Sequence, residues 1–171
     1  MIIVTHFRDI FEQSYPDRWS EFQKIGRIIQ NIIHYDFVKE ENLWNAMSIR
    51  GSKLPSEEFK RLGFLGDSIL KMIQGIILYD RGEQFQPGKL TTFRQILENK
   101  DYLAPLAEEL KYNEIGELLE IGKLSTKRAA DCFEALIGAI YVDKRNLEDM
   151  ISLVKGLTHF QKRFKELRKA S

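Results

Sequence analysis

The stretch Ser56-Glu-Glu-Phe-Lys-Arg-Leu-Gly-Phe-Leu-Gly-Asp-Ser-Ile-Leu70, continued by Lys71-Met-Ile-Gln-Gly-Ile-Ile-Leu78, decides the fold of this chain. Ser56 is a good helix N-cap, and the two glutamates after it suit the positive end of a helix dipole. Apolar side chains then recur at intervals of three and four residues, at Leu62, Leu65, Ile69, Met72, Ile73 and Ile76. This spacing predicts one long amphipathic helix.

Asp67 is the exception within this pattern, because it lies between two apolar residues near the edge of the apolar face. A carboxylate in such a place requires a partner, a cap or a metal. Gly63 and Gly66 are also unusual, since each costs roughly 1 kcal/mol relative to Ala in a helix interior. They indicate positions where another backbone or a partner subunit comes very close.

A second largely apolar helix is predicted over Lys127-Arg-Ala-Ala-Asp-Cys-Phe-Glu-Ala-Leu-Ile-Gly-Ala-Ile-Tyr-Val-Asp143. Asp131 and Glu134 are three residues apart, so both carboxylates project from one side of it. Each acid, taken singly, is explained by pairing with a neighbouring base such as Arg128. Together with Asp67, however, they make three acids on two apolar helices, which would repel one another unless a cation lay between them.

These two stretches resemble the signature helices of the ribonuclease III family. Phe64–Leu70 is similar to the end of the family's N-E-R-L-E-F-L-G-D motif, and Ala130–Asp143 is similar to A-D-x-F-E-A-L-I-G-A-I-Y-L-D. Shorter patterns of the family resemble Tyr35–Met47 and Gly88–Arg94. The resemblance extends from about Phe22 to Leu157. It implies an all-α, ribonuclease III-type endonuclease domain that forms a dimer through the central signature helix.

The family hydrolyses double-stranded RNA with Mg²⁺, for which Mn²⁺ is a possible substitute. Its metal cluster contains four acids, and three of them fall on Asp67, Asp131 and Glu134 of this chain. The resemblance therefore implies these three as metal ligands, with Asp67 and Glu134 as catalytic residues. The fourth acid falls on Gly63, one helical turn before Asp67, and glycine offers no ligand.

Two more acids near the family's site fall on Lys60 and Pro87. These departures predict a domain that is catalytically impaired and serves as an RNA-binding or structural subunit of an RNA-processing or ribosomal assembly. The alternative is an active Mg²⁺-dependent endoribonuclease, alone or paired with an intact partner chain. A helical scaffold unrelated to RNA is a third possibility.

The expected partners are double-stranded or structured RNA and a second ribonuclease III-like chain, in a homodimer or a heterodimer. In the family, the aromatic residue at the place of Phe64 enters a pocket of the partner, so Phe64, Gly63 and Gly66 are the predicted dimer interface. The predicted RNA-binding residues are Arg50, Lys53, Lys60, Lys127 and Arg128. Because the sequence ends at Ser171 without a double-stranded-RNA-binding domain, we expect RNA affinity to come from this domain, a partner or a larger assembly.

The length of 171 residues and the hydrophobic content of 43% suit one domain with a sizeable core, and the net charge of +1 restricts any RNA surface to a local patch. Cys132 is the only cysteine, which excludes an intrachain disulfide. No apolar run approaches the roughly 20 residues of a membrane span. Met1–Val4 is too short for the core of a signal peptide, and early acids argue against a mitochondrial presequence. We expect an intracellular, reducing location and no membrane partner.

Residues 1–171 are thus expected to form one domain without strands. Residues 1–15 form an extra N-terminal segment, and residues 146–171 form basic amphipathic helices that break near Gly156. Their basic face is either simply solvated or part of a phosphate-binding or docking surface. The remaining predicted helices are one capped by Asp17, one over residues 40–50, one over 90–98 and one over 102–111.

Overall fold

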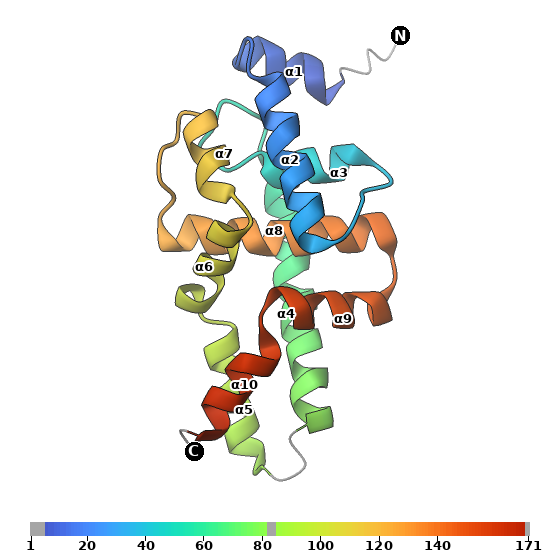
Figure 1. Ribbon diagram of the computed structural model, residues 1–171, viewed down its shortest axis with the longest axis vertical. Helices are drawn as coiled ribbons and strands as arrows, with labels where there is room; N and C mark the ends of the chain where they lie inside the picture. The colour runs from blue at the N-terminus through green and yellow to red at the C-terminus, as the bar shows by residue number, and fades with distance from the viewer. Residues whose placement is uncertain (1–5, 82–84, 170–171) are drawn as a thin grey trace.

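The computed structural model describes residues 6–81 and 85–169. This part of the chain contains helices and no strand, which confirms the all-α prediction (Figure 1). The helices are α1 (Phe7–Ser14), α2 (Trp19–Ile33), α3 (Glu40–Met47), α4 (Glu57–Arg81), α5 (Pro87–Leu97), α6 (Lys100–Glu109), α7 (Tyr112–Leu118), α8 (Thr126–Lys144), α9 (Leu147–Leu157) and α10 (Phe160–Lys169).

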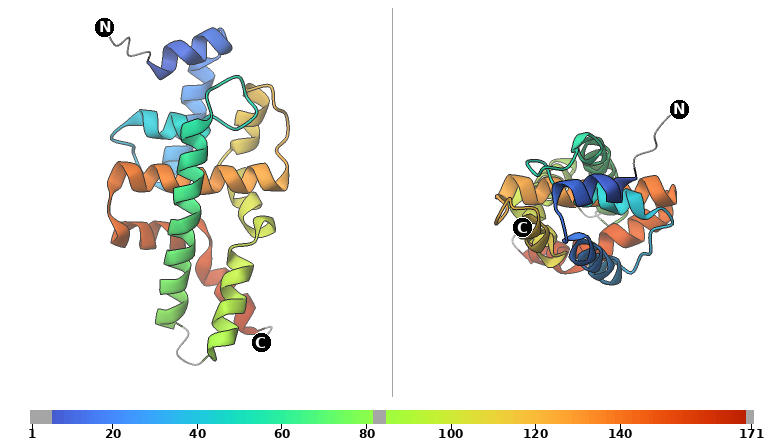
Figure 2. Two further views of the ribbon diagram at one scale, coloured as in Figure 1. Left: turned by 180° about the vertical axis from the view of Figure 1, so that it is seen from behind. Right: turned by 90° about the horizontal axis from the view of Figure 1, so that it is seen from above.

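The two helices that carry the quoted motifs, α4 and α8, cross at the centre of the molecule (Figures 1 and 2). Their backbones touch at two glycines. A Cβ atom on Gly66 would lie 1.7 Å from the carbonyl oxygen of Glu134, and a Cβ on Gly138 would lie 2.1 Å from that of Leu62. Only glycine permits this approach, so the crossing requires both residues.

Helix α8 is the core of the fold, with α3, α4 and α6 packed around it. Its small and apolar residues are needed because neighbours surround it on most sides. The buried residues of α8 are Ala129, Ala130, Cys132, Phe133, Ala135, Leu136, Ile137, Gly138, Ala139 and Ile140. Helix α4 is long and apolar enough to cross a membrane by length and composition alone, a test that a buried core helix also passes.

The N-terminal segment, as far as it is described, packs on α2 through an aromatic cluster. Phe11 is fully buried, with its ring centroid 4.5 Å from that of Phe22 and 5.3 Å from that of Trp19. The prediction that Asp17 caps α2 is wrong. The N-cap is Arg18, which makes no side-chain cap hydrogen bond, and Asp17 lies in a turn with φ of 64°.

The C-terminal end of α8 fixes the start of α3. Asp143 accepts hydrogen bonds from the Tyr35 hydroxyl at 2.5 Å, the backbone N–H groups of Val38 and Lys39 at 2.8 and 2.9 Å, and the Asn42 amide at 2.9 Å. Burial raises the pKa of Asp143, but these hydrogen bonds outweigh it and hold the pKa below its usual range. Asp143 thereby holds the backbone that leads into α3, whose N-cap residue Lys39 makes no side-chain cap hydrogen bond.

The other predicted helices are present, but α5 begins at Pro87, before the predicted residue 90, and α6 spans Lys100–Glu109 in place of 102–111. Ser125 and Asn146 cap α8 and α9 with their side chains, and the C-terminal region divides into two helices between Leu157 and Phe160. The helix predicted over residues 40–50, however, ends at Met47 and not at Arg50. Residues 82–84, between α4 and α5, lie outside the described part of the chain.

Candidate functional site

The three acids singled out in the sequence line one pocket of about 440 Å³ beside the crossing of α4 and α8. Asp67 comes from α4, and Asp131 and Glu134 come from α8. The glycine contact of the crossing explains their proximity. Gly66 directly precedes Asp67 and touches the backbone of Glu134. The side chains of Asp67 and Glu134 therefore leave the two backbones close to each other.

Two of the acids are paired with lysines in this pocket. Lys71 Nζ lies 2.7 Å from Asp67 Oδ2, and Lys100 Nζ lies 3.0 Å from Asp131 Oδ1. Lys71 is one turn after Asp67 on the same helix, a spacing that favours the contact. Lys100 begins α6 and reaches Asp131 from a different part of the fold.

Glu134 is half-buried between the other two acids. Burial raises the pKa of its carboxyl group, and the negative charges of Asp67 and Asp131 raise it further, to about 7, although Lys100 and Lys71 act in the opposite direction. At neutral pH a large fraction of this carboxyl group is therefore protonated. Mutual repulsion of the acids, which the sequence predicted, is present in the structure.

The pocket does not, as it stands, form a metal site. Among residues 6–81 and 85–169, no three acid, histidine or cysteine side chains are arranged to hold a metal ion. Lysines are bound to two of the three carboxylates, and the position of the fourth expected ligand is Gly63, which lines the same pocket without a side chain. Carboxylates are the right donors for Mg²⁺, but their present arrangement does not fit it.

The predicted RNA-binding residues do not gather in one place. Arg50 and Lys60 line the acid pocket. Lys53 instead pairs with Glu120 at 2.7 Å and does not line the pocket. Arg128 and Lys127 lie in the first turn of α8, where Lys127 is exposed and the Arg128 guanidinium lies close to Gly51.

The predicted dimer residues differ from one another in their surroundings. Phe64 is 79% exposed, but Val38 (84%) and Tyr79 (77%) are similarly exposed, so exposure alone does not single it out. A Cβ on Gly63 would meet only the carbonyl oxygen of Asp131, at 3.9 Å. Gly66 is buried against α8 of the same chain, so an intrachain contact, and not a partner subunit, explains this glycine.

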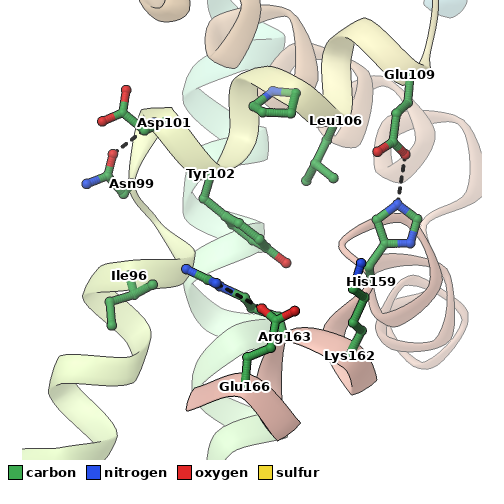
Figure 3. Close-up of a pocket in the computed structure, with 11 residues that line it drawn as sticks. Ile96, Asn99, Asp101, Tyr102, Leu106, Glu109, His159, Lys162, Arg163 and Glu166 are labelled. Carbon is green, nitrogen blue, oxygen red and sulfur yellow. Dashed lines mark hydrogen bonds and ion pairs between the residues drawn. The ribbon is translucent and has the colours of Figure 1, made fainter. Parts of the chain in front are cut away.

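A larger pocket, of about 580 Å³, lies between α6 and α10 (Figure 3) and contains none of the predicted site residues. Its charged groups largely pair with one another: His159 lies 2.7 Å from Glu109, and Arg163 lies 2.9 Å from Glu166. The acid pocket is the better candidate for a functional site because it gathers the three acids predicted from the sequence.

Lys71 and Lys100 are the site residues that sequence reasoning missed. The spacing of Lys71 four residues after Asp67 was a visible signal of an ion pair. Nothing in the sequence around Lys100 pointed to Asp131, because that contact depends on how α6 packs against α8.

Comparisons with known proteins show the family of this chain. The family model described as "Ribonuclease III domain" matches residues 60–145, which include both motif helices. Ribonuclease 3 from Bacillus licheniformis is 31% identical over 162 residues, covering 89% of this chain and 62% of the relative. Ribonuclease 3 from Nitrosococcus oceani is 38% identical over 128 residues, covering 72% of this chain and 54% of the relative.

The chain thus spans between about half and three fifths of the length of these curated relatives. Among solved structures, the nuclease domain of ribonuclease III from Campylobacter jejuni is similar, with a TM-score of 0.67 and 25% identity, covering 81% of this chain and 97% of that one. The description of that structure refers to a region involved in dimer formation. With the family model matching half of its residues and both motif helices in place, the chain belongs to the ribonuclease III family.

Proposed function

We propose that this domain binds double-stranded RNA but is impaired in its hydrolysis, and that it acts as an RNA-binding or structural subunit of an RNA-processing or ribosomal assembly. The observation that carries the proposal is the state of the acid pocket. Two of its acids form ion pairs with lysines. The position expected to carry a fourth acid is Gly63, which has no side chain.

The cationic lining of the same pocket supports RNA binding. Arg50, Lys60, Lys71 and Lys100 all line it, and ammonium and guanidinium groups bind phosphate oxygens. Duplex RNA is recognised mainly by shape and by contacts to phosphates and 2′-hydroxyls, so a local basic patch is sufficient in a chain of net charge +1.

We further propose that α4 pairs with a second ribonuclease III-like chain, in a homodimer or a heterodimer. The exposed ring of Phe64 supports this, since it lies beside Gly63, where the surface is open and another helix can approach. A two-fold interface would bury both copies of the ring.

The second candidate is an active endoribonuclease that depends on Mg²⁺ or Mn²⁺. It is favoured by the three acids lining one pocket, with no lysine within ion-pair distance of Glu134 among the described residues. In this candidate a divalent ion would have to displace Lys71 and Lys100 before the carboxylates hold it.

Both candidate functions predict binding of duplex RNA, and only the second predicts its cleavage. A radiolabelled RNA duplex of about 25 base pairs should be bound by the purified protein and left intact in the presence of Mg²⁺ or Mn²⁺. Gly63→Glu tests the missing ligand, because its side chain would enter the pocket one turn before Asp67. The matched control is Gly63→Gln, which has the same shape without the charge.

Efficient cleavage by the unchanged chain would reject impairment and favour the second candidate. Absence of duplex binding at low salt would reject both candidates. Cleavage that appears in Gly63→Glu but not in Gly63→Gln would identify the missing carboxylate as the cause of the impairment.

A further inference from the structure

Lys71 and Lys100 place two positive charges among the three acids of the pocket, where the family would place a divalent ion. They approach from different helices, α4 and α6, and each contacts a different acid. The paired carboxylates are partly withdrawn from solvent, with 40% of the Asp67 side chain and 31% of the Asp131 side chain exposed. These two pairs therefore neutralise a shared cluster.

The charges around the pocket disfavour a divalent cation. Three acids line it, against four cations, namely Arg50, Lys60, Lys71 and Lys100. Lys60 also pairs with Glu57 at 2.6 Å, but the remaining three cations still balance the three acids. A divalent ion entering the pocket meets no net negative charge, whereas a phosphate group is attracted by the nearby ammonium groups.

We propose that Lys71 and Lys100 take the place of the divalent cation, so that the pocket contacts a phosphate of the RNA backbone without metal; this rests on the RNA binding proposed above. An ammonium group carries three donors. Each lysine can therefore keep its contact with Asp67 or Asp131 and donate to a phosphate oxygen at the same time. The two lysines act as positioning and binding residues and have no role in hydrolysis.

The first test uses Mn²⁺ alone as the probe and thermal unfolding as the readout. The variants are Lys71→Met, Lys100→Met and the double variant, each of which keeps most of the apolar stem of the side chain. Lys24→Met is the matched control, since Lys24 pairs with Glu21 on the exposed face of α2 and does not line the pocket.

The melting temperature of the unchanged chain and of Lys24→Met should not respond to millimolar Mn²⁺. The double variant should melt at a higher temperature as Mn²⁺ is added, because a ligand that binds only the folded state stabilises it. We expect its affinity for Mn²⁺ to be at least about tenfold higher than that of the unchanged chain. An equal response in both proteins, or no response in the double variant, would overturn the inference.

The second test measures duplex RNA binding in EDTA and in Mg²⁺. The unchanged chain should bind equally well in both, and the double variant should bind about tenfold more weakly in EDTA. RNA binding that requires Mg²⁺ would overturn the metal-free contact while leaving the proposed RNA binding intact. If no duplex is bound under any condition, the proposed function fails, and the Mn²⁺ melts still decide whether the lysines exclude the metal.

Discussion

Replacing Gly66 by alanine tests the central claim about the fold, that α4 and α8 cross with their backbones in contact. The added Cβ would lie 1.7 Å from the carbonyl oxygen of Glu134 and 2.9 Å from the backbone nitrogen of Gly138. Both obstacles are backbone atoms of α8, so no side-chain rotation relieves them. Gly66→Ala therefore forces the two helices apart at the centre of the core.

The cost follows from that geometry. To restore an ordinary contact, the helices would have to separate by more than about 1 Å, a gap that forfeits roughly a quarter to a half of the dispersion energy between facing atoms. Overpacking of a core costs about 1–3 kcal/mol even where side chains can adjust. Alanine returns up to about 1 kcal/mol through its helix propensity. Because the obstacles are backbone atoms, the cost lies at or above the upper end of that range, and we expect a net loss of about 2 kcal/mol or more in the free energy of unfolding.

Urea unfolding followed by circular dichroism measures this loss, and Gly63→Ala is its control on the same helix. At Gly63 the nearest atom to an added Cβ is 3.9 Å away, so that variant should gain up to about 1 kcal/mol. The two glycines differ by one helical turn and are expected to respond in opposite directions. A Gly66→Ala protein within about 1 kcal/mol of the unchanged chain would refute the backbone contact.

Three further predictions follow from single contacts. Asp143→Asn should lower the free energy of unfolding by about 2 kcal/mol at pH 7, because one of the two carboxylate oxygens that accept from the Val38 and Lys39 N–H groups becomes an NH2 donor. An unchanged urea midpoint at pH 7 would contradict this. The stabilisation by Asp143 should fade below about pH 4. Phe64→Asp should give monomers or insoluble protein, whereas an unchanged chain that sediments as a monomer at micromolar concentration would exclude the dimer. The pKa of Glu134 is raised from 4.5 to about 7, so its ionisation opposes folding. The free energy of unfolding should therefore fall as the pH rises from about 4.5 to about 7, and Glu134→Gln should flatten that slope. Equal slopes in both proteins would contradict the crowding of the acids.

The sequence was sufficient to predict the helices and the identity of the acids. Periodicity located α4 and α8, and capping residues such as Ser125 and Asn146 marked helix starts, because these signals depend on nearest neighbours along one helix. Gly66 was also recognised as a point of close approach, but the approaching backbone is that of α8 and not that of a partner. A glycine in a pattern reveals that space is needed and does not reveal which segment fills it.

Contacts between distant segments escaped prediction for the same reason. Asp143 holds the segment before α3 from about a hundred residues away, and Lys100 reaches Asp131 across the packing of two helices. Asp17 has the residue type of a good cap, yet the turn before α2 places Arg18 at the cap position. Residue type supplies the potential for an interaction, and the tertiary fold decides which one forms.

The three positions at which the resemblance implies a missing acid share one structural property. Lys60 and Pro87 are exposed, and Gly63 borders a pocket with open space where a side chain would be. None of the three contributes to the core, whereas Gly66, Gly138 and the apolar residues of α8 between them cannot change without moving a helix. Acids clustered in a pocket repel one another and cost stability unless a cation is bound, so replacing them by glycine, lysine or proline relieves the fold. The shape of a ribonuclease III domain and its acid cluster therefore depend on different residues of the same two helices, and the fold can persist after the cluster has changed. For that reason Gly66→Ala tests the crossing of α4 and α8 through stability alone, whereas the pocket is tested by how stability depends on pH and Mn²⁺ and by cleavage assays.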